Sequence, residues 1–307
     1  MTGLRRALTD YLRVRRTLGF KLKHAGTMLP DFVGYLEKRR AAFVTTVAAI
    51  AWATQPRDAH PNWWRKRLVV VRGFAKYLQT IDRRTEVPPL DHLPAHEGVR
   101  ATPYVYTAAD IAALLSASET LRAPLRIATY RTLLGLLAVT GMRVGEAIAL
   151  DDRDFDRRRD VLVIRKTKFD KSREVPLHDS TVQALVRYQR DRNRLSPPRK
   201  TSSLFASTAG SRLIYQNVHE TFLKLVYAAG LGDRRPHRPT IHDLRHAFAI
   251  RTVLDWYRDG VDVEARLPLL STYLGHIGPS STYWYLTAVP ELLEAATARL
   301  ERSRVKS

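Results

Sequence analysis

The sequence predicts a mostly α-helical protein with a small antiparallel β-sheet, divided into two domains that are joined by a linker. Three observations lead to this fold class. The chain has 307 residues, enough for about two domains at roughly 100–200 residues each. Apolar residues recur at helical spacing through the first third, whereas a strand-like pair occurs only once, midway along the chain. Between the two parts, residues 82–106 hold four prolines and little periodicity.

The N-terminal domain, residues 1–85, is expected to be a bundle of helices. Leu4, Leu8, Leu12 and Leu18 form the apolar stripe of a first helix. Further helices are expected at 29–40, at 46–54 with Thr45 as the N-cap, and at 62–81. The last of these carries an apolar face of Trp64, Leu68, Val71, Ala75 and Leu78. A bundle can bury these stripes against one another.

The other face of the helix at 62–81 is cationic. It carries Arg65, Lys66, Arg67, Arg72 and Lys76. A stripe of positive charge on a helix can follow a phosphate backbone, which predicts contacts with DNA. For any one of these side chains, an ordinary solvated surface is the alternative.

Residues 86–106 are expected to be a linker, and residues 107–303 to form an α+β domain. Its first helix, at 107–117, has Thr107 as the N-cap, and a second at 126–140 ends at the motif TGMR. A short helix follows, and then DVLVIRKTKF and REVPLH predict two strands that are joined by a charged turn. The remaining helices are expected at 178–193, 216–229, 242–258 and 283–301.

Composition narrows the function classes before any motif is considered. Lys and Arg number 51 against 30 Asp and Glu, a formal net charge of +21, and the first 100 residues hold 19 basic and 8 acidic residues. Such an excess favours a polyanionic partner over a solubility coat, because phosphate contacts release counterions. The chain has no cysteine, which excludes disulfides and thiol nucleophiles. Without a bilayer-length apolar run or a secretory signal pattern, the expected location is the cytoplasm, with no membrane partner.

Two segments place cations at turns. In TGMRVGE, Arg143 lies at a turn into a helix, with Glu146 three residues on and close enough to hold the guanidinium. A surface ion pair is the alternative. In VIRKTKFDKSREVPL, Lys166, Lys168 and Lys171 surround the strand turn, although basic turns are common.

The segment IHDLRHAFAI is the most informative single motif. His242 and Arg245 lie one helical turn apart at a helix start, where anions are stabilised. A capping histidine with a solvated arginine is the alternative. His242 and His246 could also be two metal ligands, but the segment lacks the glutamate of a metalloprotease helix.

Two later motifs complete the set: YLGH supplies His276, and STYWYL supplies Tyr283 and Tyr285. Taken alone, these tyrosines would be packing residues. Together with the arginines and the lysine, they suit attack on a phosphodiester without a metal. Such chemistry needs cations around the phosphate, an acid for the leaving oxygen and an activated nucleophile.

The ordered motifs TGMRVGE, TK…KSREVPL, HDLRHAF, LGH and Tyr resemble the tyrosine recombinase, or phage integrase, family. The resemblance covers about 107–300. It implies an α+β tyrosine-recombinase catalytic domain preceded by a SAM-like helical DNA-binding domain. The stretch from Arg245 to His276 is about two helical turns longer than in typical members, and in this the chain resembles transposon-borne recombinases.

The resemblance also assigns roles to six residues. Arg143 and Arg245 resemble the two arginines that clamp the scissile phosphate, and Lys168 matches the lysine that protonates the 5′-oxygen. His242 and His276 match the two histidines of the site. Tyr285, nine residues beyond His276, matches the nucleophile, which leaves Tyr283 and Trp284 as packing. Lys171 resembles a turn residue that touches phosphate or a base.

The activity implied by the resemblance is site-specific recombination through a 3′-phosphotyrosyl intermediate, with no cofactor, metal or ATP. The implied partner is double-stranded DNA, with a tetramer on two sites, other recombinases as further partners and association with the nucleoid. A topoisomerase IB-like relaxing enzyme and a non-catalytic DNA-binding protein of the same fold are the alternatives.

Overall fold

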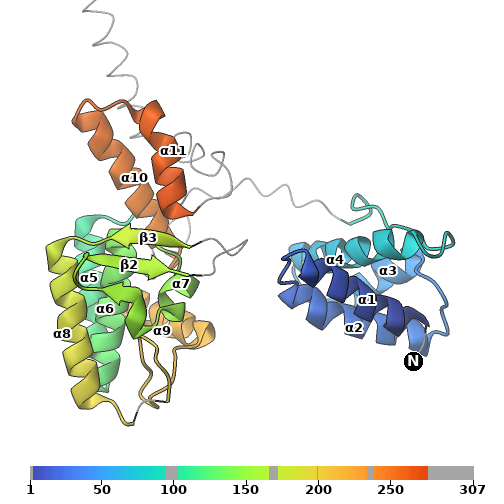
Figure 1. Ribbon diagram of the computed structural model, residues 1–307, viewed down its shortest axis with the longest axis horizontal. Coiled ribbons are helices and arrows are strands. Elements are labelled where there is room, and N and C mark those ends of the chain that lie inside the picture. Colours follow the sequence, from blue (N-terminus) through green and yellow to red (C-terminus); the bar gives the residue numbers. More distant parts are fainter. Residues whose placement is uncertain (1–2, 94–102, 166–171, 199, 234–237, 276–307) are drawn as a thin grey trace, which may run out of the picture. The chain divides into compact units, whose positions relative to one another are not determined.

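A computed structural model describes residues 3–93, 103–165, 172–198, 200–233 and 238–275 of the chain. It divides into two compact units, Met1–Ala101 and Thr102–Ser307, each with its own hydrophobic core (Figure 1). The described part is mostly helical with one three-stranded antiparallel sheet, which confirms the expected fold class. No helix in it is both long and apolar enough to span a bilayer.

Over residues 3–93, the first unit is a bundle of four helices. They are α1 (Gly3–Thr17), α2 (Lys23–Lys38), α3 (Thr46–Ala53) and α4 (Pro61–Gln79). Thr45 caps α3 as predicted, since its hydroxyl accepts the Ala48 N–H at 3.2 Å. The apolar face predicted for α4 is also confirmed, because Leu68, Val71, Ala75 and Leu78 are buried and Trp64 packs against the same core.

Two predictions for this unit are wrong. Leu18 lies beyond the end of α1 and is 65% exposed. The six residues that separate it from Leu12 turn a helix by about 600°, which places Leu18 off the stripe. The second helix begins at Lys23 instead of residue 29 and contains Pro30. Pro30 faces solvent, so the missing backbone hydrogen bond is tolerated while Ala25 and Met28 anchor the added turns in the core.

The segment that follows α4 packs on the first unit over residues 86–93, where a linker was expected. Leu93 is buried, and Val87 and Leu90 pack against the same core. Glu86 accepts the Thr46 N–H at 2.7 Å, and Arg65 of α4 donates to the Leu90 carbonyl at 3.3 Å. Apolar residues between the prolines therefore fix this segment to the bundle.

The second unit alternates helices with short extended segments. Its elements are α5 (Ala108–Ala117), η1 (Ser118–Thr120), α6 (Pro124–Thr140), α7 (Val144–Ala149), η2 (Asp152–Asp154), β1 (Phe155–Asp156), β2 (Val161–Ile164), β3 (Arg173–Pro176), α8 (Asp179–Leu195), α9 (Tyr215–Ala228), α10 (Asp243–Arg258) and α11 (Val263–Leu274). Helix α6 packs against α5, α8 and α10, so it is the central helix of the unit. The helix predicted at 283–301 lies outside the described residues.

The sheet has the strand order β1-β2-β3, with both neighbouring pairs antiparallel. Leu162 of β2 pairs with Phe155 on one side and Val175 on the other, and all three side chains are buried. Strand β1 was not predicted, because a two-residue strand carries too short an alternation to be recognised. The pairing places Arg173, the first residue of β3, opposite Ile164.

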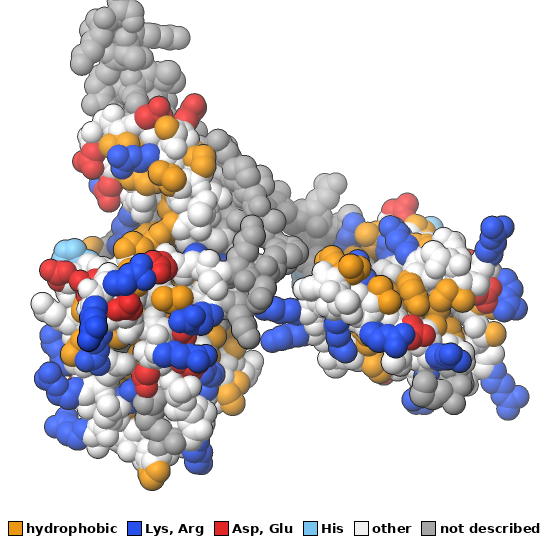
Figure 2. Space-filling view, viewed as in Figure 1, with side chains coloured by type: hydrophobic (Ala, Val, Ile, Leu, Met, Phe, Trp, Pro, Cys, Tyr) orange, Lys and Arg blue, Asp and Glu red, His pale blue; other side chains and the backbone are white. Residues whose placement is uncertain are grey.

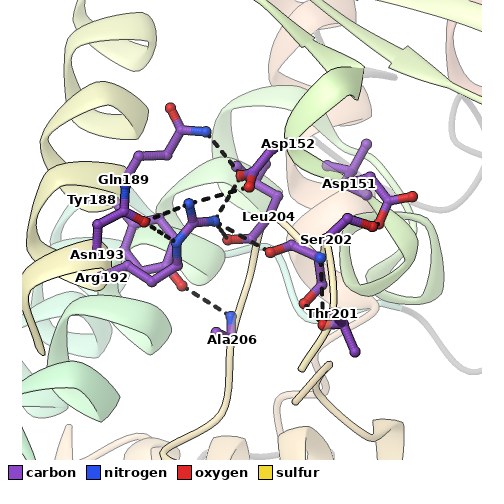
Figure 3. A network of polar contacts seen from close by, with 12 residues as sticks. Asp151, Asp152, Tyr188, Gln189, Arg192, Asn193, Thr201, Ser202, Leu204 and Ala206 are labelled. Carbon is purple, nitrogen blue, oxygen red and sulfur yellow. Dashed lines mark hydrogen bonds and ion pairs between the residues drawn. The ribbon is translucent and has the colours of Figure 1, made fainter. Parts of the chain in front are cut away.

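A buried arginine of α8 joins the segment after that helix to η2 (Figure 3). Arg192 is 1% exposed and donates to the Asp152 carboxylate at 2.7 Å. The same guanidinium donates to the backbone carbonyls of Ser203 and Leu204. The Tyr188 hydroxyl accepts the Ala206 N–H at 3.2 Å, so α8 fixes both η2 and the segment 203–206.

Helix α11 lies beside α10 (Figure 1) and was not predicted as a separate helix. The two share a small core that includes Ile250, Val253, Leu267 and Leu270. Asp262 caps α11 by accepting the Ala265 N–H at 3.2 Å. The long stretch between Arg245 and His276 is thus a helical hairpin, which delivers the end of α11 back to the start of α10.

Candidate active site

The TGMR motif forms a tight connection between α6 and α7. Helix α6 ends at Gly141, whose φ of +58° is a left-handed conformation that favours glycine. Arg143 is the N-cap residue of α7 and donates its backbone N–H to the Glu146 carboxylate at 2.9 Å. Its Nη1 donates to the other Glu146 oxygen at 3.0 Å. The predicted ion pair of Arg143 and Glu146 is therefore present.

A second arginine, Arg173 of β3, holds the same carboxylate. Its Nη1 and Nη2 donate to the two Glu146 oxygens at 3.0 and 2.7 Å. The sequence pattern predicts Arg173 only as part of a strand. The signal that could have found it is an arginine at the start of a strand beside a basic turn.

Arg245 is buried to 2% exposure near the start of α10. Its Nη1 donates to the Gly141 carbonyl at 2.8 Å, and its Nη2 donates to the Leu274 carbonyl at 2.7 Å. The guanidinium therefore bridges the TGMR turn and the end of α11, which are 133 residues apart in the chain.

The end of α11 brings the two predicted arginines together. Arg143 donates to the Leu274 carbonyl at 3.5 Å and to the Gly275 carbonyl at 3.0 Å, and Arg245 shares the Leu274 acceptor. Carbonyls at a helix C-terminus carry partial negative charge, which stabilises cations there. Gly275 has a φ of +67° and terminates the helix, so the LG of the LGH motif shapes this acceptor pair.

His242 lies immediately before α10 and is exposed, while its ring meets the buried His246 ring edge-on at 4.6 Å between centroids. Asp243 anchors this start by accepting both the N–H and the hydroxyl of Thr240 at 2.8 Å. Among the described residues, no group of three or more His, Asp or Glu side chains is placed to hold a metal ion.

The electrostatics of the cluster keep its carboxylate ionised. Burial raises the pKa of Glu146, but the hydrogen bonds and charge of Arg173, joined by those of Arg143, outweigh it and hold that pKa below its ordinary value. Tyr273, on the last turn of α11, stacks on Phe248 at 5.6 Å, and burial raises its pKa to about 12. Tyr273 therefore keeps its proton near neutral pH and acts as a packing residue.

Three guanidinium groups thus bind one carboxylate and three carbonyl oxygens, so positive charge is in excess. Arg143 is the more accessible of the two predicted arginines, with 39% of its side chain exposed. An anion such as a phosphate can be stabilised at such a place by charge-assisted hydrogen bonds. Lys168, Lys171, His276, Tyr283 and Tyr285 lie outside the described residues, and their roles stay predictions.

The cations predicted on α4 divide into three groups. Arg67 is 11% exposed, its guanidinium lies 3.7 Å over the Trp52 ring, and it donates to the Trp52 carbonyl at 2.9 Å. Arg67 therefore packs in the bundle rather than facing solvent. Arg65 and Arg72 are half-buried and bind the carbonyls of Leu90 and Pro88.

Lys66 and Lys76 form the third group, which is exposed to solvent. Lys and Arg side chains dominate the charged surface of both units over the face in Figure 2. The DNA contacts expected of α4 thus rest first on its two lysines, and they remain a prediction.

Comparison with known proteins gives a consistent result. Residues 105–291 match the model of the phage integrase family. The chain is 44% identical to the "Putative integrase/recombinase y4rB" of Sinorhizobium fredii, over 98% of this chain and 98% of that protein. It is 38% identical to y4rE of the same organism, over 97% of each. The tyrosine recombinase XerD of Bradyrhizobium diazoefficiens is 29% identical over 96% of this chain and 88% of that protein.

Solved structures share the fold. The integrase of transposon Tn1549, in complex with transposon right end DNA, is 18% identical with a TM-score of 0.66 over 98% of this chain and 99% of that one. The XerH site-specific recombinase bound to its palindromic difH substrate is 22% identical with a TM-score of 0.62, over 90% of this chain and 78% of that one.

Proposed function

The chain belongs to the phage integrase family of tyrosine recombinases, and on that premise we propose how its own residues carry out site-specific recombination. It is a tyrosine-type site-specific recombinase, an enzyme that breaks and rejoins DNA strands. The observation that carries the assignment of roles is the convergence of Arg143 and Arg245 on the Leu274 carbonyl. A relaxing enzyme that acts on one duplex is not favoured, because the relatives matched over nearly their full length are integrases and recombinases.

Arg143 and Arg245 hold the scissile phosphate in this proposal. Guanidinium groups that are fixed before the substrate arrives can stabilise the charge on the equatorial oxygens without reorganising. The carbonyls of Gly141, Leu274 and Gly275 orient the two guanidinium groups, and Glu146 adds a further contact to Arg143. His242, at the start of α10, and His276 donate hydrogen bonds to the same phosphate.

The covalent step exchanges one phosphodiester bond for another. The Tyr285 oxygen forms a bond to phosphorus and its proton passes to His242, while the bond from phosphorus to the 5′-oxygen breaks. Lys168 supplies the proton that the departing 5′-oxygen takes up. The product is a 3′-phosphotyrosyl link and a free 5′-hydroxyl. A 5′-hydroxyl from the partner strand then attacks this link and loses its proton to Lys168, and the released Tyr285 oxygen takes its proton back from His242. The bond energy is conserved throughout, so the balance of bonds requires neither ATP nor a metal.

Double-stranded DNA is the substrate, and we extend the proposal to the assembly on it. Residues 1–85 form the DNA-binding domain, with the exposed cations of α4 and Lys171 on the phosphate backbone, and residues 107–303 form the catalytic domain. Strand exchange between two sites would require four protomers, with or without other recombinases in the tetramer. The protein would act in the nucleoid, where chromosomal DNA lies, and would recombine the DNA of a mobile element.

The nucleophile is tested on a nicked suicide substrate that traps the covalent intermediate. Tyr285→Phe should form no protein–DNA adduct while binding the same DNA with unchanged affinity, because only the attacking oxygen is removed. Tyr283→Phe is the matched control and should still form the adduct. If the reverse pattern appears, with adduct from Tyr285→Phe and none from Tyr283→Phe, the assignment of the nucleophile is wrong.

A further inference from the structure

Arg173 has no part in the mechanism above, yet it lies at the centre of the cluster. It opens β3, and only 13% of its side chain is exposed. Its two terminal nitrogens each bind a different oxygen of Glu146, at 3.0 and 2.7 Å. Such a pairing of a guanidinium fork with a carboxylate fixes both groups in a common plane.

Glu146 is thereby shared between two arginines. It accepts the Arg143 N–H and Nη1 at 2.9 and 3.0 Å, and its own side chain is 12% exposed. A buried ion pair is weak evidence for stability, because desolvation offsets the attraction between the charges. Fixing the direction of a neighbouring group is a use that such a pair does serve.

Arg173 also contacts the other group that holds Arg143. A Cβ atom built on Gly275 would lie 2.8 Å from Arg173 Nη1 and 3.2 Å from its Cζ. The Arg173 guanidinium therefore lies directly against the turn whose carbonyl accepts Arg143 Nη2 at 3.0 Å. Arg173 thus contacts both groups that hold Arg143, namely Glu146 and the Gly275 turn. In the described part of the chain it makes no hydrogen bond to Arg143 itself.

From these contacts we infer that Arg173 is a positioning residue for Arg143: it fixes Glu146 and the Gly275 turn so that the Arg143 guanidinium has one orientation before DNA binds. The inference rests on the proposed function, because it gives Arg143 a phosphate to hold. Lysine cannot replace Arg173, since a single ammonium cannot bind both carboxylate oxygens in a plane.

The role predicts a signature in the pH dependence. The groups that face Glu146 are Arg143 beside it on the TGMR turn and Arg173 from β3, with Arg245 and Tyr273 beyond them on α10 and α11. Burial raises the pKa of Glu146, and the hydrogen bonds of Arg173 are the largest opposing effect. Without Arg173 that pKa rises, so the ionised carboxylate that holds Arg143 is lost as the pH falls.

The experiment is single-turnover cleavage of the suicide substrate by the full-length protein, at saturating protein concentration and across pH 5 to 9. Arg173→Met should lower the cleavage rate by about 10²-fold, as expected for a displacement of about 1 Å in a phosphate-holding group. Its ratio to wild type should fall further toward low pH, because Glu146 becomes protonated. Dividing by the wild-type rate at each pH removes the pH effects that the two proteins share. DNA affinity should stay within about twofold of wild type.

Arg159→Met is the matched control. Arg159 makes an equivalent two-pronged pair with Glu174 of the same strand, at 2.8 and 2.7 Å, but on the exposed surface. This variant should cleave like wild type at every pH. A loss in Arg159→Met equal to that in Arg173→Met would overturn the inference, because disruption of β3 would then explain both.

Arg173→Lys covers the case in which Arg173→Met fails to fold, as judged by circular dichroism and DNA binding. Arg173→Lys should keep DNA binding yet recover little cleavage, and wild-type cleavage by Arg173→Lys would overturn the inference. In the variant Glu146→Gln, adding Arg173→Met should cost little more, because Arg173 acts through Glu146. Fully additive losses would contradict that route.

Arg143→Ala separates this inference from the proposed function. If Arg143→Ala cleaves normally, the phosphate-holding role of Arg143 fails, and the role of Arg173 fails with it. If Arg143→Ala is inactive while Arg173→Met matches wild type at every pH, only the positioning role is refuted.

Discussion

Gly141→Ala should damage both the stability and the activity of the second unit. Gly141 ends α6 with a φ of +58° and turns the chain toward Arg143, two residues on. A Cβ atom at this position would lie 2.9 Å from Phe248 Cγ and 3.2 Å from Leu274 Cδ2. The Gly141 carbonyl also accepts Arg245 Nη1 at 2.8 Å. One added methyl group thus strains the backbone, collides with a packed ring and displaces an acceptor.

The magnitude follows from two separable costs. A left-handed conformation costs an alanine about 1–2 kcal/mol. Forcing a methyl group into a packed core costs about 1–3 kcal/mol more. The expected loss in the free energy of unfolding is therefore about 2–5 kcal/mol. Gly260→Ala is the matched control, because Gly260 has a φ of +71° but nothing within 4 Å of its Cβ position, so it should show only the first cost.

The assay compares urea unfolding of the three proteins by far-ultraviolet circular dichroism, together with cleavage of the suicide substrate. Gly141→Ala should unfold at lower urea than Gly260→Ala and should cleave about 10²-fold more slowly than wild type, because the turn that carries Arg143 shifts. Gly260→Ala should cleave normally. Equal stability of the two variants would refute the close approach of Phe248 as the reason for glycine at this turn.

Two other predictions concern groups outside the active site. The double variant Lys66→Gln/Lys76→Gln should weaken DNA binding, and the slope of log affinity against log salt should fall by about one for each phosphate that a lysine no longer neutralises. The control is Lys38→Gln, which changes an exposed lysine on α2. An unchanged slope in the double variant would contradict a role for α4 on DNA. Arg192→Met should lower the free energy of unfolding by about 3–5 kcal/mol, because Asp152 and two carbonyls lose their buried partner. Exposed Arg190 on the same helix should tolerate methionine with a change within about 0.5 kcal/mol, and urea unfolding of both variants measures the difference.

Much of the fold could be predicted because it depends on local patterns. Thr45 and Thr107 begin helices because their side chains accept an N–H three residues later. The predicted ends of α6, α9 and α10 lie within two residues of the observed ones. Where prediction failed, tertiary packing overrode the local signal: Pro30 lies inside α2, and residues 86–93 pack on the bundle instead of forming a free linker.

For the active site, the sequence by itself predicted which residues carry the chemistry, since Arg143 and Arg245 stand in motifs whose order is typical of the family. It also predicted that the helix before Arg143 ends at the TGMR motif, where Gly141 terminates α6. Spacing along one segment also revealed the pair of Arg143 with Glu146, three residues apart.

Only the tertiary structure decided how these motifs meet. The end of α11 supplies the carbonyls that orient Arg143 and Arg245. Arg173 of β3 binds the Glu146 carboxylate, which Arg143 also binds. The tertiary structure also packed the Arg67 guanidinium on the Trp52 ring and left Lys66 and Lys76 in solvent. The physical reason is that hydrogen bonds between residues 27 to 132 positions apart depend on how helices pack, and no local pattern records that packing.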